Sequence, residues 1–166
     1  HHSDIVPWQM LAEERGVEIR YVPVLDDYSL DMEVYEASLE GAKLVCVVHT
    51  SNVLGVRNPL ETIIQLAHDA GAKVLIDAAQ GVPHDRIDFD AFGPDFMAFS
   101  AHKMCGPTGI GALLVRPDVF EEMEPFMGGG DMIQTVTIEG STYQTNEHEF
   151  EAGTPRIAEA IGWDAA

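Results

Sequence analysis

Short apolar runs alternate along this chain with amphipathic stretches, and this alternation restricts the possible folds more than any other feature. Continuous apolar runs predict buried strands. They occupy residues 43–49, 73–79, 96–101 and 111–116. Helical periodicity occupies residues 5–15, 31–39 and 60–70. Because strands that alternate with helices are typical of βαβ units, the sequence predicts a three-layer α/β fold in which a mostly parallel sheet is flanked by helices.

The character of the sequence changes after residue 127. We expect residues 1–127 to form the α/β core, with a further strand at residues 17–24. Residues 128–166 favour extended segments, with a hairpin around Glu139–Gly140. The final residues have a helical pattern without a stop signal. We therefore expect the start of a helix that leads to a further domain, and an internal fragment of a longer protein.

The chain carries a formal net charge of -19 from 28 acidic and 9 basic residues. A surface of this sign disfavours nucleic acids and anionic membranes as partners. No apolar stretch approaches the roughly 18 residues of a membrane span, and the two cysteines give no disulfide framework. We expect a cytoplasmic, globular protein. The spread of acidic residues suits a halophilic source, with an ordinary acidic protein as the alternative.

Polar residues follow three of the predicted buried strands at the point where each strand ends. These segments are residues 49–52, 77–80 and 100–103. The carboxyl ends of parallel strands meet at one edge of a sheet, and ligands of open α/β sheets bind outside that edge. The sequence therefore predicts a functional site there.

Lys103, one of only three lysines, lies at the edge of the predicted core, where an unpaired ammonium group is costly. An ion pair with Asp77 is the structural explanation. Pyridoxal 5'-phosphate (PLP) offers a chemical one, because its aldehyde needs an amine and its ring nitrogen needs a carboxylate. We expect Lys103 to supply the amine and Asp77 the carboxylate. Gln80 is then placed to contact the phenolic oxygen, and Ser100 and His102 the phosphate.

Other chemistries fit these segments less well. The GPTGIG stretch at residues 106–111 lacks the Gly-Lys-Ser/Thr ending of a P-loop, and we expect a tight turn that leads into a strand. His102 and Cys105 lack the further ligands of a zinc site, so no metal site is predicted. The G-x-S-x-G elbow of serine hydrolases is also missing. We expect Cys105 to be a small packing residue, and His68 and His148 to lie on the surface.

Six motifs follow one another along the chain: HHSDIVPWQ, HTSNVLG, VLIDAAQ, FSAHKMCGPTGIG, GGGDMI and FEAGTP. In this order they resemble the class V aminotransferase family of PLP-dependent enzymes, and within it the SUF-type cysteine desulfurase and selenocysteine lyase group. The resemblance covers essentially the whole chain. It implies the fold type I architecture of these enzymes, with this chain as part of the large domain.

The resemblance implies roles for the residues at the strand ends. Lys103 matches the lysine that forms a Schiff base with PLP, and Asp77 matches the partner of the ring nitrogen. Gln80 matches the residue that bonds the phenolic oxygen. Ser100 and His102 match phosphate ligands.

Three further roles come from the resemblance alone. His1 matches a catalytic histidine that stacks on the pyridine ring, and Asn52 matches an asparagine near the cofactor and the substrate carboxylate. Thr154 matches a threonine that reaches the phosphate in the neighbouring subunit, which implies a homodimer. Ala101 is a departure, because the family often has glycine at this position.

The implied activity is that of a cysteine desulfurase, which converts L-cysteine to L-alanine and passes the sulfur as a persulfide to an acceptor protein of iron–sulfur cluster assembly. Neither Cys46 nor Cys105 matches the cysteine that accepts sulfur, and the substrate-binding arginine has no counterpart here. We therefore expect a fragment that is inactive alone and binds PLP weakly or not at all. Selenocysteine lyase, aminotransferase or epimerase activity is the alternative within the family, and a non-catalytic scaffold is the alternative outside it.

Overall fold

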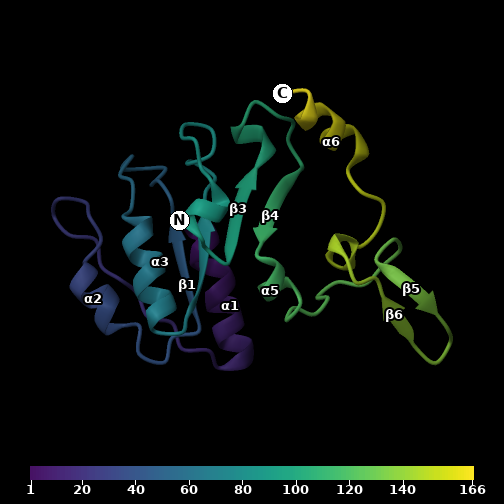
Figure 1. The fold of residues 1–166 in the computed structure, drawn as a ribbon, viewed down its shortest axis with the longest axis horizontal. Coiled ribbons are helices and arrows are strands. Elements are labelled where there is room, and N and C mark those ends of the chain that lie inside the picture. The colour runs from purple at the N-terminus through teal and green to yellow at the C-terminus, as the bar shows by residue number, and fades with distance from the viewer.

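A four-stranded sheet forms the centre of the molecule in the computed structural model, which describes all 166 residues (Figure 1). The strands are β1 (Leu44–Val48), β2 (Lys73–Asp77), β3 (Phe96–Ser100) and β4 (Gly111–Val115). They lie in this order across the sheet, with β1, β2 and β3 parallel and β4 antiparallel to β3. The predicted α/β fold with a mostly parallel sheet is confirmed.

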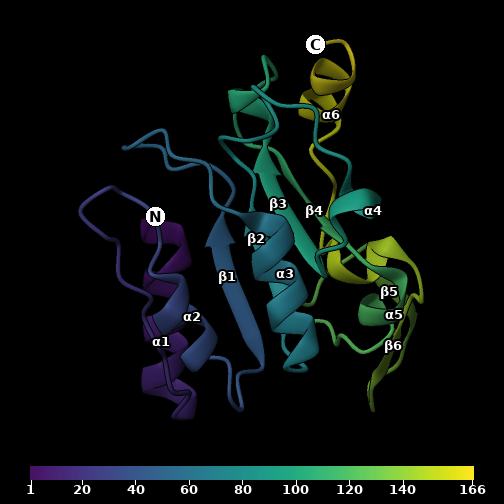
Figure 2. The ribbon, with the colours of Figure 1, turned by 60° about the vertical axis from the view of Figure 1, so that its left-hand side comes forward.

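Helices flank the sheet. They are α1 (Val6–Arg15), α2 (Met32–Ala37), α3 (Leu60–Asp69), α4 (Phe89–Phe92), α5 (Pro117–Phe120) and α6 (Ile157–Asp164). Three short 3-10 helices are η1 (His2–Asp4), η2 (Ala101–Lys103) and η3 (Glu147–Phe150). Figure 2 shows α1 and α2 on the β1 side of the sheet and α3 across its face. Each helix falls short of the length and apolarity that a membrane crossing requires.

The helix α3 forms because its apolar residues recur at helical spacing. The buried positions are Leu60, Ile63, Ile64 and Ala67. They pack on strand residues of the main core, including Val74, Ile76 and Met97. Burial of each large apolar side chain contributes about 1.5–3 kcal/mol. Gly71 then adopts a φ of 77°, a left-handed conformation that suits glycine, and turns the chain into β2.

The predicted strand at residues 17–24 is wrong. This segment makes only an isolated bridge, between Val24 and Leu30, and joins no sheet. A groove of about 630 Å³ is lined by this segment, by α1 and by β1. A strand forms only where a second backbone lies within hydrogen-bonding reach, so a strand-like pattern is not sufficient by itself.

Beyond β4 the chain leaves the sheet and forms a hairpin (Figure 1). In it, β5 (Ile133–Val136) pairs antiparallel with β6 (Ser141–Tyr143). The Thr137 N–H donates to the carbonyl of Gly140 at 2.8 Å and closes the turn. This turn lies where the sequence favoured one, around Glu139–Gly140.

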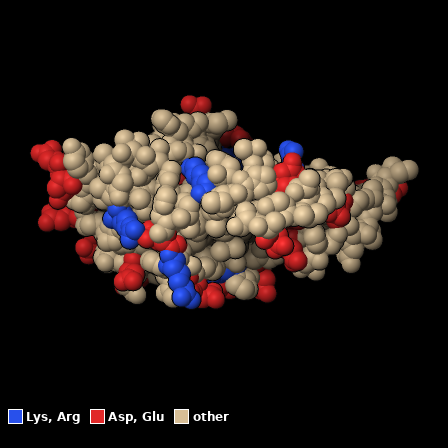
Figure 3. Space-filling view, turned by 90° about the horizontal axis from the view of Figure 1, so that it is seen from above, with Lys and Arg blue, Asp and Glu red and all other residues tan.

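On the face seen from above (Figure 3), acidic residues are scattered and do not gather in one patch. Figure 3 shows Asp and Glu at many separate places on the face seen from above, with fewer Lys and Arg. Ion pairs such as Arg15–Glu14 and Arg116–Asp118 join exposed side chains. Such pairs contribute little to stability. Most of the negative charge therefore faces solvent.

Candidate active site

The carboxyl ends of β1, β2 and β3 lie side by side. Val48 pairs with Asp77 across β1 and β2, and Asp77 pairs with Ala98 across β2 and β3. The His49 N–H donates to the carbonyl of Asp77 at 2.8 Å, and the Ala78 N–H donates to the carbonyl of Ala98 at 2.9 Å. The polar segments that follow these strands therefore share the edge at which open α/β sheets bind ligands.

Asp77 is the last residue of β2 and is half-buried. Its Oδ1 accepts a hydrogen bond from the Ala79 N–H at 2.9 Å, which orients the carboxylate. Among the N–H groups of the chain, only that of Ala79 donates to this carboxylate. The strand pairing of β2 and the bond from Ala79 hold Asp77 in place. Its second carboxylate oxygen stays available to another group.

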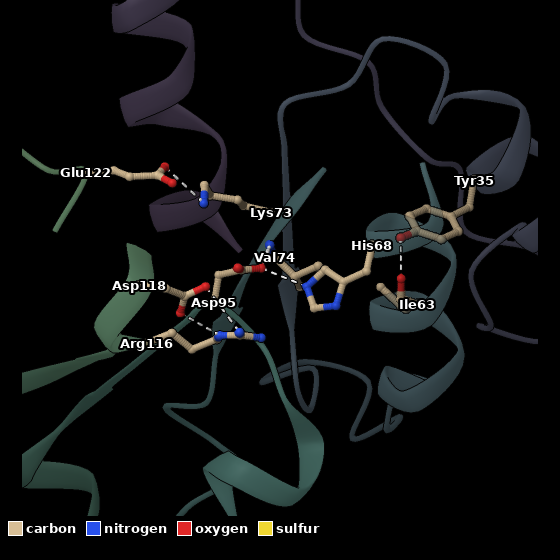
Figure 4. Close-up of polar contacts among 9 residues, drawn as sticks. All are labelled: Tyr35, Ile63, His68, Lys73, Val74, Asp95, Arg116, Asp118 and Glu122. Atoms are coloured by element: carbon tan, nitrogen blue, oxygen red, sulfur yellow. Dashed lines mark hydrogen bonds and ion pairs between the residues drawn. The ribbon is translucent and has the colours of Figure 1, made fainter. Parts of the chain in front are cut away.

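Lys103 ends η2, which follows β3 directly, and its side chain is half-buried. Its amine has no ion-pair partner, whereas Lys73 pairs with Glu122 at 3.2 Å (Figure 4). The ion pair with Asp77 that would explain Lys103 structurally is therefore not formed. Lys103 and Asp77 instead follow two neighbouring strands as separate polar groups.

The chain turns tightly after Lys103. The N–H groups of Met104 and Gly106 both donate to the carbonyl of Ala101, at 2.8 and 2.9 Å. A Cβ atom on Gly106 would lie 2.8 Å from Trp163 and 3.0 Å from the Ala101 oxygen. Only glycine fits such a close approach. The GPTGIG stretch is thus a turn that leads into β4, as predicted.

Five other predicted ligands are distributed over three strand ends and one distant segment. Gln80 and Ser100 are half-buried, in the turn after β2 and at the end of β3. His102 and Asn52 are exposed, in η2 and in the loop after β1. Thr154 is exposed in the segment between η3 and α6. The first four therefore belong to the sheet edge, and Thr154 does not.

His1 and Asp4 lie at the same edge although they are remote from Asp77 in the sequence. One ring nitrogen of His1 and one carboxylate oxygen each of Asp4 and Asp77 lie within 4.8 Å of one another. Burial, and then the nearby charge of Asp77, raise the pKa of Asp4 to about 6. The sequence pointed to His1 but not to Asp4, whose only signal was its position in the same HHSD motif.

His49 is a second residue to which the sequence assigned no role. It is buried, and its Nδ1 lies 2.8 Å from Oγ1 of Thr50. Burial lowers the pKa of His49 and so favours the neutral ring. A Cβ atom on Gly81 would lie 2.7 Å from this ring. The neutral ring of His49 therefore packs against the turn that follows β2.

Two expectations about single residues are wrong. His68 is half-buried and donates from Nε2 to Oδ2 of Asp95 at 2.8 Å, and the same oxygen accepts from the Val74 N–H at 2.7 Å (Figure 4). This cluster lies at the amino ends of β2 and β3, opposite the candidate site. Cys105 is exposed, with a φ of 62°, and is not a packing residue. The side chain of His148 is 45% exposed and lies on the surface, as expected.

The fold and the residues at its sheet edge define a class of protein. The sequence profile of the class-V aminotransferases matches residues 1–166, and the chain belongs to that family. Two solved structures are similar over 99% of this chain. A cysteine desulfurase from Thermococcus onnurineus has a TM-score of 0.94 and 42% identity, and this chain covers 42% of it. The cysteine desulfurase CsdA from Escherichia coli has a TM-score of 0.96 and 37% identity, again with 42% covered.

Curated relatives are similar at higher identity. A probable cysteine desulfurase from Streptomyces coelicolor is 49% identical over 167 residues, which span 100% of this chain and 40% of that protein. A cysteine desulfurase from Haloferax volcanii is 47% identical, over 100% of this chain and 39% of that protein. The chain thus spans about two fifths of the length of the curated relatives it matches.

Proposed function

We propose that this chain is the cofactor-binding part of a PLP-dependent cysteine desulfurase. The observation that carries the proposal is the pair Asp77 and Lys103, which follow neighbouring strands and form no ion pair with each other. A carboxylate and an amine kept separate in this way can serve the two reactive positions of one ligand. Relatives named cysteine desulfurase that are 47–50% identical over the whole chain support the choice of activity.

The residues of the sheet edge fit PLP. When bound, PLP supplies an aldehyde that reacts with an amine and a ring that withdraws electrons from a substrate. Lys103 offers the amine. The second carboxylate oxygen of Asp77 offers an acceptor for the ring nitrogen, because only the first is held by Ala79. Gln80 would contact the phenolic oxygen.

The phosphate of the cofactor needs hydrogen-bond donors. Ser100 and His102 can supply them from the end of β3 and from η2. His1, exposed beside Asp77, can stack on the ring, and Asn52 can approach the substrate carboxylate. Thr154 would serve the phosphate of a second subunit in a homodimer.

Each side chain has its own task in the proposed reaction. Lys103 holds the cofactor and then moves a proton to or from the substrate. The carboxylate of Asp77 would accept a hydrogen bond from the ring nitrogen and so favour a proton on that atom. The turn held by Ala101 and Gly106 fixes the chain immediately after Lys103.

Cys46 is unsuited to accept sulfur. It lies half-buried in β1, and burial, followed by the charge of Asp4, raises the pKa of its thiol to about 12. The thiolate is the reactive form of cysteine, so Cys46 is inert at neutral pH. We propose that the complete protein supplies the sulfur-accepting cysteine and the arginine for the substrate carboxylate. L-cysteine is the proposed substrate, and an iron–sulfur assembly protein is the proposed acceptor.

The test uses the full-length protein that contains this chain. We expect Lys103→Ala to abolish the visible absorbance of covalently bound PLP and the release of alanine from L-cysteine, because Lys103 is the one lysine of this chain at the carboxyl ends of the strands. Lys43→Ala, which changes an exposed lysine before β1, is the control and should retain both. Visible absorbance that survives Lys103→Ala would disprove the assignment. Formation of a keto acid instead of alanine would show that the protein is an aminotransferase.

A further inference from the structure

Asp4 lies against the residue that, on the proposed function, binds the ring nitrogen of PLP. It ends η1, where its N–H donates to the carbonyl of His1 at 3.0 Å. Its carboxylate and that of Asp77 have oxygens within 4.8 Å of each other. The Oδ2 atom of Asp4 is buried, and by distance and angle no N–H or O–H of the chain donates to it.

A buried carboxylate oxygen without a donor is costly, unless the carboxyl group is itself protonated. A protonated carboxyl donates a hydrogen bond, and the neighbouring carboxylate of Asp77 has about four lone-pair sites, so it can accept from Asp4 as well as from Ala79 and a bound ring nitrogen. Two carboxyl groups at this separation cannot both ionise without strong repulsion. The geometry of the pair therefore favours one proton shared between Asp4 and Asp77.

The other groups that face Asp4 do not remove this proton. His1 lies next to it, with Nδ1 accepting from the Ser3 N–H at 3.2 Å. The thiol of Cys46 in β1 is neutral at neutral pH, because its pKa is raised to about 12. Burial first, and then the charge of Asp77, raise the pKa of Asp4 to about 6, so the carboxyl keeps its proton below that pH.

We propose that Asp4 is a positioning residue that donates a hydrogen bond from its protonated carboxyl to Asp77, and so sets how strongly Asp77 binds the proton of the cofactor ring nitrogen. At low pH, Asp77 is the single charged member of the pair and is oriented by both Ala79 and Asp4. At higher pH, Asp4 ionises. Asp4 and Asp77 then both carry negative charge, and together they would stabilise a proton on the ring nitrogen more strongly.

The first measurement needs no cofactor. In the full-length apoprotein at about pH 5, we expect an infrared band of a protonated carboxyl that is lost as the pH rises past about 7. The band should be missing from Asp4→Asn and present in Asp26→Asn, a control in an exposed loop. A wild-type spectrum identical to that of Asp4→Asn would overturn the proposal that Asp4 and Asp77 share a proton. A difference that a chelator abolishes would also overturn it, because a bound cation would then explain the cluster.

The second measurement uses the PLP-loaded protein. We expect the visible absorbance of wild type to shift with pH around the pKa of Asp4, and Asp4→Asn to lose this shift while it retains PLP affinity within about twofold, because the amide still donates to Asp77. Asp4→Ala should weaken PLP binding about tenfold, since the donor is gone. If wild type binds no PLP, the proposed function and this role both fail. If it binds PLP but Asp4→Asn keeps the wild-type pH profile, only the role of Asp4 fails.

Discussion

A single buried carboxylate, Asp95, joins two elements at the amino ends of the strands. It is 6% exposed, and its Oδ2 accepts from both the Val74 N–H and His68 (Figure 4). The first bond satisfies a main-chain group of β2, and the second ties α3 to the sheet. Because Val74 is itself fully buried, no water can replace Asp95 as the acceptor.

We expect Asp95→Ala to lower the free energy of unfolding by about 2–4 kcal/mol, because it leaves the Val74 N–H buried and unsatisfied. Asp95→Asn keeps an acceptor oxygen and should cost less. Urea denaturation of the full-length protein measures both. Asp26→Ala, in an exposed loop, should leave the midpoint unchanged. An Asp95→Ala variant as stable as Asp26→Ala would show that this cluster does not hold α3.

The location of a residue at a strand end could be predicted from the sequence, whereas its role stays a prediction. Asp77 and Lys103 were located because an ionisable residue directly after an apolar run must lie at a strand end. Asp4 could not be located in this way, because its neighbour Asp77 is brought to it by packing across the sheet edge. His68 was misjudged for the same reason: its partner Asp95 belongs to another element. Contacts of this kind depend on the whole fold and leave no local pattern.

At the scale of elements, α6 is held against the turn that follows Lys103. The ring of Trp163 packs edge-on to Phe99 with centroids 5.9 Å apart, and it also covers Gly106. The last helix and the end of β3 are therefore one packed unit, although they are remote in sequence. A change in this turn should affect both.

We expect Gly106→Ala to destabilise the protein by about 1–3 kcal/mol, because its new methyl group would overlap Trp163 and the Ala101 carbonyl. The tryptophan emission should shift to longer wavelength as Trp163 gains contact with water. Gly128→Ala, whose Cβ would meet nothing within 4 Å, is the matched control. Unchanged emission and stability in Gly106→Ala would mean that α6 does not pack here in solution.

Strands and helices differ in how far a sequence specifies them. The helix α3 was predicted nearly to its ends, since its stripe of apolar residues and the flanking Pro59 and Gly71 are local signals. The direction of β4 was not evident, because a continuous apolar run does not say whether the strand lies parallel or antiparallel. The segment at residues 17–24 has the composition of a strand. It forms no run of hydrogen bonds with a neighbouring strand, and strand formation requires such a partner.

The whole molecule is dominated by its negative charge. With a net charge of -19, mutual repulsion opposes the compact state at low ionic strength. Screening shortens the range of this repulsion to about 3 Å at 1 M salt. The acidic residues are dispersed (Figure 3), so screening should act on many weak interactions together.

We expect the midpoint of thermal unfolding of the full-length protein to rise by several degrees as KCl increases from about 0.1 to 1 M. A continued rise above about 1 M would favour the halophilic interpretation, since simple screening is nearly complete there. An uncharged osmolyte at equal osmolality is the control and should not reproduce the dependence on charge. A midpoint that falls with KCl would contradict this account of the acidic surface.

The groove beside β1 has a consequence for how these molecules behave toward one another. Within these 166 residues β1 is the outer strand of the sheet, so one row of its main-chain donors and acceptors has no neighbouring strand of this chain, and apolar residues of α1 lie alongside. An open backbone edge of this kind is a template for aggregation. The charged residues of the groove are balanced, with Asp4 and Glu18 against Arg20 and Lys43, but the chain as a whole carries a net charge of -19 that repels a second copy. Added salt would therefore stabilise each folded molecule and at the same time remove the barrier that prevents self-association.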